Sequence, residues 1–374
     1  MSKAAVTPAQ VQAQVSELVS RLGREDIRAM SAYPVPSSAG MVKLDAMENP
    51  YSLPEPLRAA IGAAVAGASI NRYPDPTAPG LRARLREAMA IPDGAGMILG
   101  NGSDEIIHIV VQALAREGAV VLAPEPTFVM YKVDALLARV RYVGVPLRAD
   151  FSLDVEAMLA AIAEHCPAVV FLAYPNNPSG NLFDTAAMER ILRASPGLVV
   201  VDEAYHAFAR ETFLSRLGEF PNLMVMRTVS KLGLAGIRLG YAAAAAPWIH
   251  EFDKVRPPYN VGVLTQAVGE TLLAHHEVLQ GQADDIVAER GRLAAALAAL
   301  PGVTVFPSDA NFLLARLPDA PAAMAGLKVR GVLVKNLHGG HRLLHNCLRF
   351  TVGTANENRR LLEALAAALG AKAH

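Results

Sequence analysis

The sequence has 374 residues, of which 52% are hydrophobic and 19% are charged, so it encodes a folded chain with a large core rather than a disordered linker. Lys and Arg together number 35, as do Asp and Glu, and the formal net charge is zero. A balanced charge gives no general attraction to nucleic acid or to an anionic membrane, so the expected partners are small molecules.

The cysteines and the apolar runs exclude several further classes of protein. Cys166 and Cys347 show neither a CxxC pattern nor the Cys and His spacing of a zinc site, so we expect no disulfide framework and no metal. This cysteine usage is typical of a reducing compartment, and we predict a cytoplasmic protein. No run approaches the roughly 20 apolar residues of a membrane helix. Residues 1–22 lack the apolar centre of a signal peptide and predict a surface helix, so we expect a soluble, unprocessed chain.

The elements predicted along the first two thirds of the chain indicate an α/β protein. The first 45 residues predict one helix and no sheet of their own. From about residue 95 short β-branched runs alternate with amphipathic helical stretches, the pattern of a sheet covered by helices on both faces. The strand sequences are apolar without alternation, so both faces of each strand are expected to be buried. Strands are predicted at 119–123, 141–145, 168–174, 198–204, 223–228 and 238–244, and helices at 104–116, 127–139, 154–164 and 184–194.

The pattern changes after the segment RPPYN at 256–260. Pro257 and Pro258 are expected to break the preceding helix and to form a hinge. We therefore predict a large cofactor-binding domain over 46–256, with a mostly parallel sheet sandwiched by helices, and a smaller α+β domain that combines 1–45 with 257–374. The elements predicted for the second domain are a long helical region at 262–300, strands at 302–306, 311–316, 332–335 and 347–352, and a helix from about 355.

Polar residues that directly follow apolar runs are the first candidates for function, because ligands bind outside the carboxyl ends of the strands in open α/β sheets. Four segments qualify: GNGSDE at 100–105, NNPSG at 176–180, DEAY at 202–205 and SKLGLAGIRLG at 230–240. The first is a glycine turn before a helix, where free N–H groups favour a phosphate. A plain helix start capped by Ser103 or Asp104 explains the same residues.

Lys231 is the lysine whose setting is least typical of a solubilising side chain, because it follows an apolar strand and precedes a glycine-rich turn. A desolvated amine at this place has a lowered pKa and is suited to a Schiff base. Taken alone, the residue is more often a lysine that faces water at the end of a sheet. Lys335, which follows VLV, has a similar local sequence and is a rival candidate.

Asp202 ends a strand that we expect to be buried, where an unpaired carboxylate is costly. A helix cap or a metal would satisfy it, but no cluster of His, Asp and Glu with ligand spacing accompanies it. A protonated ring nitrogen would also satisfy it. At about 3 Å and an effective dielectric of 20, the attraction is roughly 5 kcal/mol before desolvation. Half of this energy keeps a pyridine nitrogen protonated at neutral pH.

Together these segments resemble the fold-type I pyridoxal phosphate aminotransferases. NPSG at 177–180 resembles their NPxG motif, DEAY at 202–205 their DxxY motif, and SKLGLAGIRLGY at 230–241 their Schiff-base lysine segment. The motifs stand in family order between about Tyr33 and Asn356. Within that family the chain resembles the histidinol-phosphate aminotransferases, through the segments LDAMENPY, NRYPDP, GNGSDE, PTFVMY and CLRFTVGT.

The resemblance implies a role for each residue that matches a motif. Lys231 would form the Schiff base with pyridoxal 5'-phosphate, and Asp202 would pair with the pyridine nitrogen of the cofactor. Individually, Phe128 is also compatible with a core position, Tyr73 with a turn, and Asn177 or Ser230 with a helix cap. The other implied cofactor contacts are Asn177 and Tyr205 at the ring oxygen, Phe128 on the ring face, and Ser103, Asp104, Ser230, Arg238 and the neighbouring subunit's Tyr73 at the phosphate.

For the substrate, the resemblance implies contacts from Tyr33, Asn49, Lys335 and Arg349. A planar guanidinium such as that of Arg349 can donate two parallel hydrogen bonds to the carboxylate of an amino donor. In the histidinol-phosphate aminotransferases the same pocket accepts a phosphate. Lys335 supplies a positive charge where some relatives have arginine, but its ammonium group cannot form the bidentate hydrogen bonds of a guanidinium. Met47 stands where many relatives have asparagine, a departure that affects the shape of the entrance.

The predicted activity is amino transfer between L-histidinol phosphate and 2-oxoglutarate, giving imidazole-acetol phosphate and glutamate, in histidine biosynthesis. The expected partners are a small-molecule amino donor, a phosphorylated keto substrate and a second copy of the chain in a homodimer with shared active sites. Alternatives are an aromatic amino acid aminotransferase and a threonine-phosphate decarboxylase-like lyase, which releases carbon dioxide. A non-enzymatic binding protein of the same fold is disfavoured by the presence of Lys231, Asp202 and Arg238.

Overall fold

The computed structural model describes residues 7–32 and 35–370, and the chain divides into two compact units, 1–39 and 40–374. The first unit contains helix α1, Pro8–Leu22, and the short helix α2, Glu25–Arg28. Helix α1 begins with a capping box in which Thr7 and Gln10 exchange hydrogen bonds, and its residues are exposed. The predicted surface helix is therefore present, whereas α2 was not predicted.

The larger sheet of the second unit holds seven strands in the order β2-β8-β7-β6-β5-β3-β4. Strands β3 to β7 are parallel, and β8 is antiparallel to both of its neighbours, so the prediction of a mostly parallel sheet is confirmed. The six predicted strands are present, and β2 was not predicted. The bounds are β2 Gly96–Asn101, β3 Val120–Glu125, β4 Arg141–Pro146, β5 Val169–Ala173, β6 Leu198–Asp202, β7 Leu223–Thr228 and β8 Leu239–Ala244.

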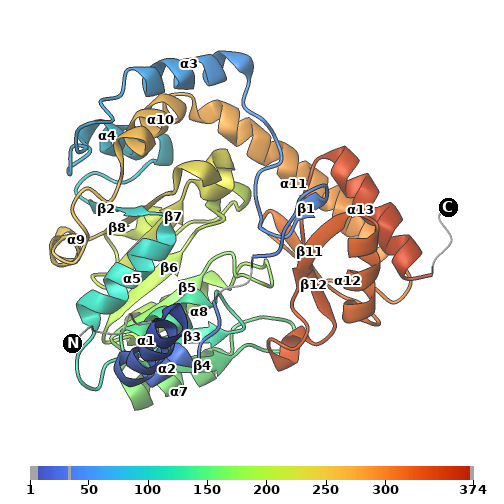
Figure 1. The fold of residues 1–374 in the computed structure, drawn as a ribbon, viewed down its shortest axis with the longest axis horizontal. Coiled ribbons are helices and arrows are strands. Elements are labelled where there is room, and N and C mark those ends of the chain that lie inside the picture. The colour runs from blue at the N-terminus through green and yellow to red at the C-terminus, as the bar shows by residue number, and fades with distance from the viewer. Residues whose placement is uncertain (1–6, 33–34, 371–374) are drawn as a thin grey trace. The chain divides into compact units, whose positions relative to one another are not determined.

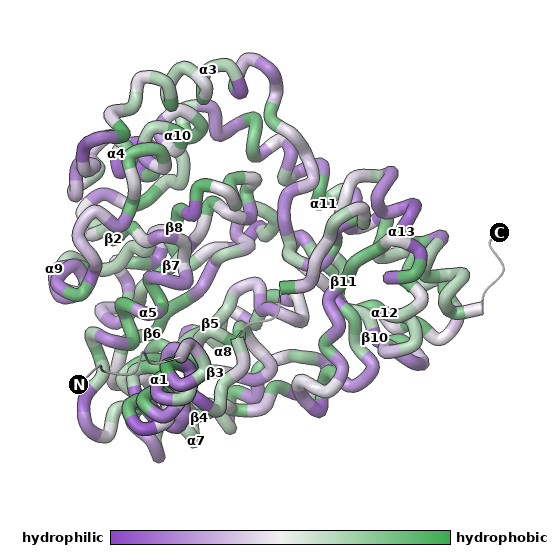
Figure 2. Tube along the Cα trace, viewed as in Figure 1, coloured by the Kyte–Doolittle hydropathy of each residue, from purple (hydrophilic) through white to green (hydrophobic). Residues whose placement is uncertain are grey.

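Helices cover both faces of this sheet (Figure 1). Helices α5 Ser103–Leu114, α6 Met130–Leu137 and α9 Ala246–Asp253 pack on one face, and α7 Val155–His165 and α8 Thr185–Ala194 share a hydrophobic core with the other face. Successive strand residues alternate between the two cores, so the central strands β5 to β7 are apolar along most of their length, and β6 and β7 turn polar only at their carboxyl ends. Figure 2 shows the hydropathy along the chain. This burial on both faces explains the continuous apolar runs in the sequence.

The expectation that every strand is buried on both faces is wrong for β4. Strand β4 lies at the edge of the sheet and pairs only with β3, and Arg141 at its start is exposed. In contrast, β5 to β8 are buried at every residue. The sequence RYVGV begins with Arg141 and is less apolar than the runs of β3 and β5, which agrees with its place at the edge of the sheet.

The smaller sheet has five strands in the order β1-β11-β12-β10-β9. Strand β1, Val42–Leu44, was not predicted, and it is a strand because it pairs in parallel with β11 from the far end of the chain. Helices α12 and α13 pack beside this sheet (Figure 1). The remaining bounds are β9 Thr304–Val305, β10 Phe312–Arg316, β11 Val332–Asn336, β12 Cys347–Thr351, α12 Ala320–Val329 and α13 Ala355–Ala368.

The helical region predicted at 262–300 is two helices, α10 Val263–Leu273 and α11 His276–Ala298, because His275 has a non-helical backbone (φ −127°, ψ 38°). Helix α10 packs against α3 Glu55–Ala66 and α4 Pro79–Met89, which were not predicted. Helix α9 ends at Asp253, before the two prolines that we expected to break it. The division of the chain into domains at 45/46 and 256/257 stays a prediction.

Candidate active site

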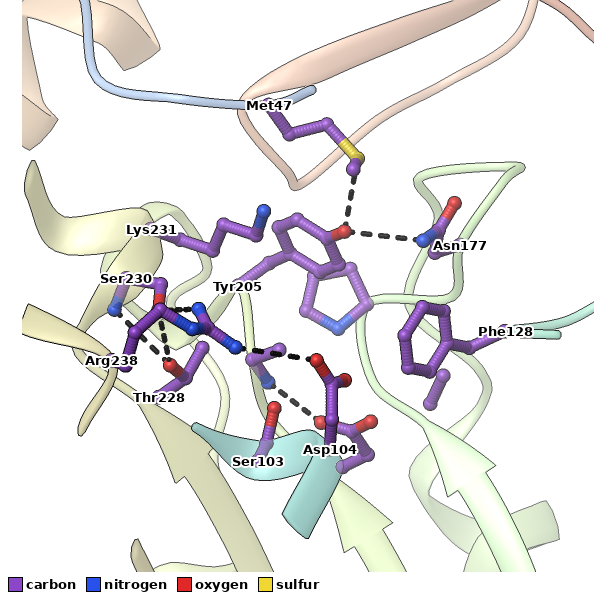
Figure 3. Close-up of a pocket in the computed structure, with 14 residues that line it drawn as sticks. Met47, Ser103, Asp104, Phe128, Asn177, Tyr205, Thr228, Ser230, Lys231 and Arg238 are labelled. Carbon is purple, nitrogen blue, oxygen red and sulfur yellow. Dashed lines mark hydrogen bonds and ion pairs between the residues drawn. The ribbon is translucent and has the colours of Figure 1, made fainter. Parts of the chain in front are cut away.

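A pocket lies at the carboxyl edge of the larger sheet, where β5, β6 and β7 end side by side (Figure 3). Nine predicted cofactor residues line it: Ser103, Asp104, Phe128, Asn177, Asp202, Tyr205, Ser230, Lys231 and Arg238. These residues come from five separate chain segments, and parallel strands bring them together because such strands end at the same edge. The lining residues that we did not predict are Met47, Ala173, Pro175, Ala204 and Thr228.

Lys231 follows β7 in a π-helical turn, Ser230–Leu234, and lies in the pocket rather than on a solvent-facing surface. Its Nζ donates a hydrogen bond to the Ala46 carbonyl oxygen at 3.1 Å. Burial and, as a smaller cause, the nearby Arg349 guanidinium lower the pKa of the amine to about 8. An amine with a pKa this close to neutrality can both lose and accept a proton, as a Schiff-base lysine must.

Asp202 is buried at the end of β6 and faces the pocket. Its Oδ2 accepts a hydrogen bond from the Tyr131 hydroxyl at 2.6 Å, and its Oδ1 accepts one from the Ala204 N–H at 3.1 Å. Burial raises the pKa of the carboxyl to about 6, although these two hydrogen bonds act in the opposite direction. Among the described residues no group of His, Cys, Asp and Glu side chains could hold a metal ion. The carboxyl is therefore placed to pair with a cationic group in the pocket.

Tyr131 is a site residue that sequence reasoning missed. It is fully buried on α6, stacks on Phe171 with ring centroids 4.5 Å apart, and meets the pocket lining through its hydrogen bond to Asp202 and through an edge-on contact with the Phe128 ring, with centroids 5.7 Å apart. The residue stands in PTFVMY, a segment that carried part of the family resemblance. Its spacing to Asp134 and Ala135 on one helix face predicts a core residue, and nothing local indicates a hydrogen bond to a residue 71 positions away.

We expect the Tyr131→Phe substitution to raise the pKa of Asp202, since the Tyr131 hydrogen bond lowers it. Loss of a hydrogen bond to a charged group, worth about 1.5–3 kcal/mol, should reduce kcat roughly tenfold or more when the cofactor is bound. The pH dependence of kcat measures the first effect. Tyr142→Phe is the matched control, because Tyr142 interacts with Glu125 away from the pocket. Equal effects of the two substitutions would contradict the assignment.

The opposite end of the pocket is built to hold an anion. Helix α5 begins there, and its N-cap residue Gly102 provides no side-chain cap, so capping by Ser103 or Asp104 is not what the structure shows. Arg238 reaches the same place, with Nη1 3.3 Å from Ser230 Oγ and Nη2 3.3 Å from Asp104 Oδ2. A side chain at Gly102 would collide with the Arg238 guanidinium. The start of α5, the Ser230 hydroxyl and the Arg238 guanidinium thus line the same end of the pocket, together with the Asp104 carboxylate that Arg238 contacts.

Between these two ends lies space for a flat ring. Phe128 is half-buried just before α6 and lines the pocket. Asn177 Nδ2 donates to the Tyr205 hydroxyl oxygen at 3.2 Å, while Asn177 Oδ1 accepts from Arg349 Nη1 at 2.6 Å. Arg349, buried on β12, therefore lies one hydrogen bond behind the pocket lining, and its Nη2 donates to the Asp45 carbonyl oxygen at 2.9 Å.

Of the other predicted residues, those that the structure describes do not line the pocket. Tyr73 is 81% exposed and stacks on Tyr259 with ring centroids 4.7 Å apart. The Asn49 amide donates to the Leu232 carbonyl oxygen at 3.3 Å and to Gln282 Oε1 at 3.0 Å, so it braces the Lys231 turn. The two further residues are Lys335, which pairs with Arg349 across β11 and β12, and Tyr33, which lies outside the described residues.

The chemistry of this pocket matches pyridoxal 5'-phosphate group by group. The anion cradle at α5 fits the phosphate, Phe128 fits the ring face, and the buried Asp202 carboxyl fits a ring nitrogen that carries a proton. The Lys231 amine lies in the same pocket with a lowered pKa. The residues present therefore fit the cofactor that the resemblance implies.

Comparison with known proteins agrees with this geometry. Residues 39–365 match the family described as aminotransferase class I and II, and the chain belongs to that family. Two relatives are named histidinol-phosphate aminotransferase 1. The protein from Ralstonia nicotianae is 58% identical, with 96% of this chain and 98% of the relative covered, and that from Burkholderia lata is 59% identical, with 92% and 97% covered.

A solved structure shows the same fold at lower identity. It is the histidinol-phosphate aminotransferase from Sinorhizobium meliloti in complex with pyridoxal 5'-phosphate, 23% identical to this chain with a TM-score of 0.82. The match covers 93% of this chain and 98% of that one. The predicted fold class is thereby confirmed.

Proposed function

We propose that this chain is a pyridoxal 5'-phosphate-dependent aminotransferase that moves the amino group between L-histidinol phosphate and 2-oxoglutarate. The observation that carries the proposal is the presence, in one pocket, of a lysine with a lowered pKa, a buried acid and an anion cradle. The names of the relatives that are 58–59% identical over nearly the whole chain support the choice of substrates.

When bound, the cofactor supplies an electron sink for the negative charge left on the substrate α-carbon. The chain supplies the rest. Lys231 Nζ, with a pKa of about 8, takes and returns the proton of that carbon near neutral pH. Asp202 keeps a proton on the ring nitrogen, and Tyr131 holds the Asp202 carboxyl in place through a 2.6 Å hydrogen bond. Arg238, Ser230 and the N–H groups at the start of α5 fix the phosphate.

Arg349 and Lys335 support recognition of an anionic substrate. They lie opposite each other on neighbouring strands β12 and β11, so two cationic side chains come from adjacent backbone positions. Arg349 is buried and donates from Nη1 to Asn177 and from Nη2 to the Asp45 carbonyl oxygen, so its planar guanidinium would bind a carboxylate or a phosphate by exchanging these contacts, whereas Lys335 supplies a point charge. Two cations favour a substrate that bears a phosphate over an aromatic keto acid without one.

A panel of three assays tests this proposal. The first is amino transfer from glutamate to imidazole-acetol phosphate, the second is the same transfer to phenylpyruvate, and the third is carbon dioxide release from threonine phosphate. We expect a kcat/KM for imidazole-acetol phosphate at least about a hundredfold above that for phenylpyruvate, because a charge-assisted phosphate contact is lost in the latter. Preference for phenylpyruvate, or release of carbon dioxide, would overturn the substrate assignment and leave the cofactor assignment intact.

A homodimer with shared active sites is part of this proposal. Tyr73 is exposed with its ring stacked on Tyr259, which supports a role on the surface of one copy toward the pocket of another. The two cysteines are free thiols, which supports a reducing, cytoplasmic location. Among the helices that the structure describes, none is long and apolar enough to cross a bilayer.

A further inference from the structure

The buried side chain of Asn176 connects two loops, each of which carries a residue of the pocket. Phe128 follows β3 and Asn177 follows β5, and both line the pocket (Figure 3). Asn176 itself is completely buried and is not part of the lining. A buried amide is costly unless its polar groups are hydrogen-bonded, so the partners of Asn176 indicate what the residue does.

The nitrogen and the oxygen of the Asn176 amide both have partners. Nδ2 donates to the Pro126 carbonyl oxygen at 3.1 Å and to Ser179 Oγ at 2.8 Å, and Oδ1 accepts from Thr127 Oγ1 at 2.9 Å. Because a carbonyl oxygen can only accept, the contact with Pro126 fixes which end of the amide is the NH₂ group. The Thr127 hydroxyl is therefore the donor in its contact with Asn176.

Two of these three hydrogen bonds cross from one loop to the other. Pro126 and Thr127 directly precede Phe128, so the bonds to them connect the loop of Phe128 to the loop of Asn177. The bond to Ser179 stays within the loop of Asn177. The three bonds therefore differ in what they hold, although they come from one side chain.

The loop of Asn177 is also held by backbone hydrogen bonds of Asn176. The Asn176 N–H donates to the Asn181 carbonyl oxygen at 2.9 Å, and the Asn176 carbonyl oxygen accepts from the Gly180 N–H at 2.7 Å. Both bonds remain when the contact with Ser179 is lost, so the shape of this loop does not depend on that contact alone. The position of the loop relative to Phe128 depends on the two bonds that cross between the loops.

We infer that Asn176 is a positioning residue that fixes the spacing between Phe128 and Asn177, so that the cofactor ring contacts both at once. The family resemblance implies that Phe128 contacts the ring face and Asn177 the ring oxygen. A rigid ring makes both contacts at one spacing of the two loops, and a spacing that is set before binding lowers the cost of binding. The inference rests on the proposed function, since it concerns the same pocket and the same cofactor.

Two substitutions that each remove one hydroxyl separate this role from simple packing. Thr127→Val breaks a hydrogen bond between the loops, and Ser179→Ala breaks the bond within one loop. We expect the Kd of pyridoxal 5'-phosphate to rise about threefold to tenfold in Thr127→Val and less than about twofold in Ser179→Ala. Thr127→Ser keeps the hydroxyl and should restore the Kd. Asn176→Ala removes both bonds between the loops and should raise the Kd at least as much as Thr127→Val.

The experiment is equilibrium binding of pyridoxal 5'-phosphate to the full chain freed of cofactor, repeated with 3-deoxypyridoxal 5'-phosphate, which lacks the ring oxygen. Without that oxygen the ring can follow the loop of Phe128 alone, so the effect of Thr127→Val should fall below about twofold. A general loosening of the fold would weaken the binding of both ligands equally. Equal changes of Kd in Thr127→Val and Ser179→Ala, or the same rise with the 3-deoxy compound, would overturn the inference. Failure of the unsubstituted chain to bind pyridoxal 5'-phosphate would instead overturn the proposed function.

Discussion

Replacing Lys231 by alanine should abolish the visible absorbance of the lysine-bound cofactor and lower kcat by at least about a thousandfold. The physical reason is that the substitution removes both the covalent link to the cofactor and the group that moves the substrate proton. The phosphate cradle at α5 and the ring contacts are untouched, so the variant should still bind pyridoxal 5'-phosphate. Absorbance spectra and the glutamate-dependent assay measure the two effects.

The control for this substitution is Lys254→Ala. Lys254 follows α9, is more than half exposed and pairs with Glu251 at 2.7 Å, so its loss should leave both the spectrum and the turnover unchanged. Circular dichroism separates loss of chemistry from loss of fold. A purified Lys231→Ala variant that keeps the visible band and its turnover would remove the central assignment.

Asp202→Asn should lower kcat about a hundredfold or more while leaving the fold intact. An amide is neutral at every pH, so it cannot hold a proton on a ring nitrogen as a carboxylate does. The amide oxygen can accept from the Ala204 N–H in the place of Oδ1, and the amide NH₂ can donate to the Tyr131 hydroxyl oxygen in the place of Oδ2, so the packing around the residue is preserved. Asp134→Asn is the matched control, since Asp134 is also buried but pairs with His108 outside the pocket lining. Equal losses in the two variants would indicate a structural effect.

The Asp202→Asn substitution should also change how the free energy of unfolding of the cofactor-free chain depends on pH. Burial raises the pKa of Asp202 to about 6 from its ordinary value of 3.8. Between these values the folded chain keeps a proton that the unfolded chain has released, so the free energy of unfolding falls as the pH rises. Two pKa units correspond to about 3 kcal/mol. In the Asp202→Asn variant the free energy of unfolding should not show this fall with pH.

Urea denaturation of the two cofactor-free proteins at about pH 5 and about pH 7 measures the difference. The stability of Asp202→Asn relative to the unsubstituted chain should increase with pH across this range. Parallel stabilities at the two pH values would show that the Asp202 carboxyl has an ordinary pKa in the folded chain. That result would mean that burial puts no penalty on the Asp202 carboxylate for a ring cation to relieve.

The electrostatics of the pocket connect these predictions. Burial shifts the pKa values of Lys231 and Asp202 in opposite directions, because it disfavours the charged form of each group, the ammonium of the lysine and the carboxylate of the aspartate. The pKa of Lys231 falls to about 8 and that of Asp202 rises to about 6, so the pair lies nearer neutrality than either group would in water. A cofactor that carries a ring cation and an aldehyde would relieve both penalties, which is the physical basis for expecting tight binding.

Much of the site could be predicted because its residues follow strands whose sequences are distinctive. Asp202 and Lys231 each come at or just after a run of buried residues, β6 and β7, and such runs end at one edge of a parallel sheet. The edge position of β4 could not be predicted, since it depends on which strands pair. Strand β1 could not be predicted either, because three residues form a strand only beside a partner nearly 300 positions away.

The sequence by itself determined the alternation of strands and helices, the order of the motifs and most of the residue types that line the pocket, because these depend on neighbours along the chain. Only the tertiary structure decided which side chains hold those residues in place. Tyr131 reaches Asp202 across 71 positions, Met47 reaches Tyr205 across 158, and Arg349 reaches Asn177 across 172. A hydrogen bond between such distant residues depends on strand order and register, which no local pattern encodes.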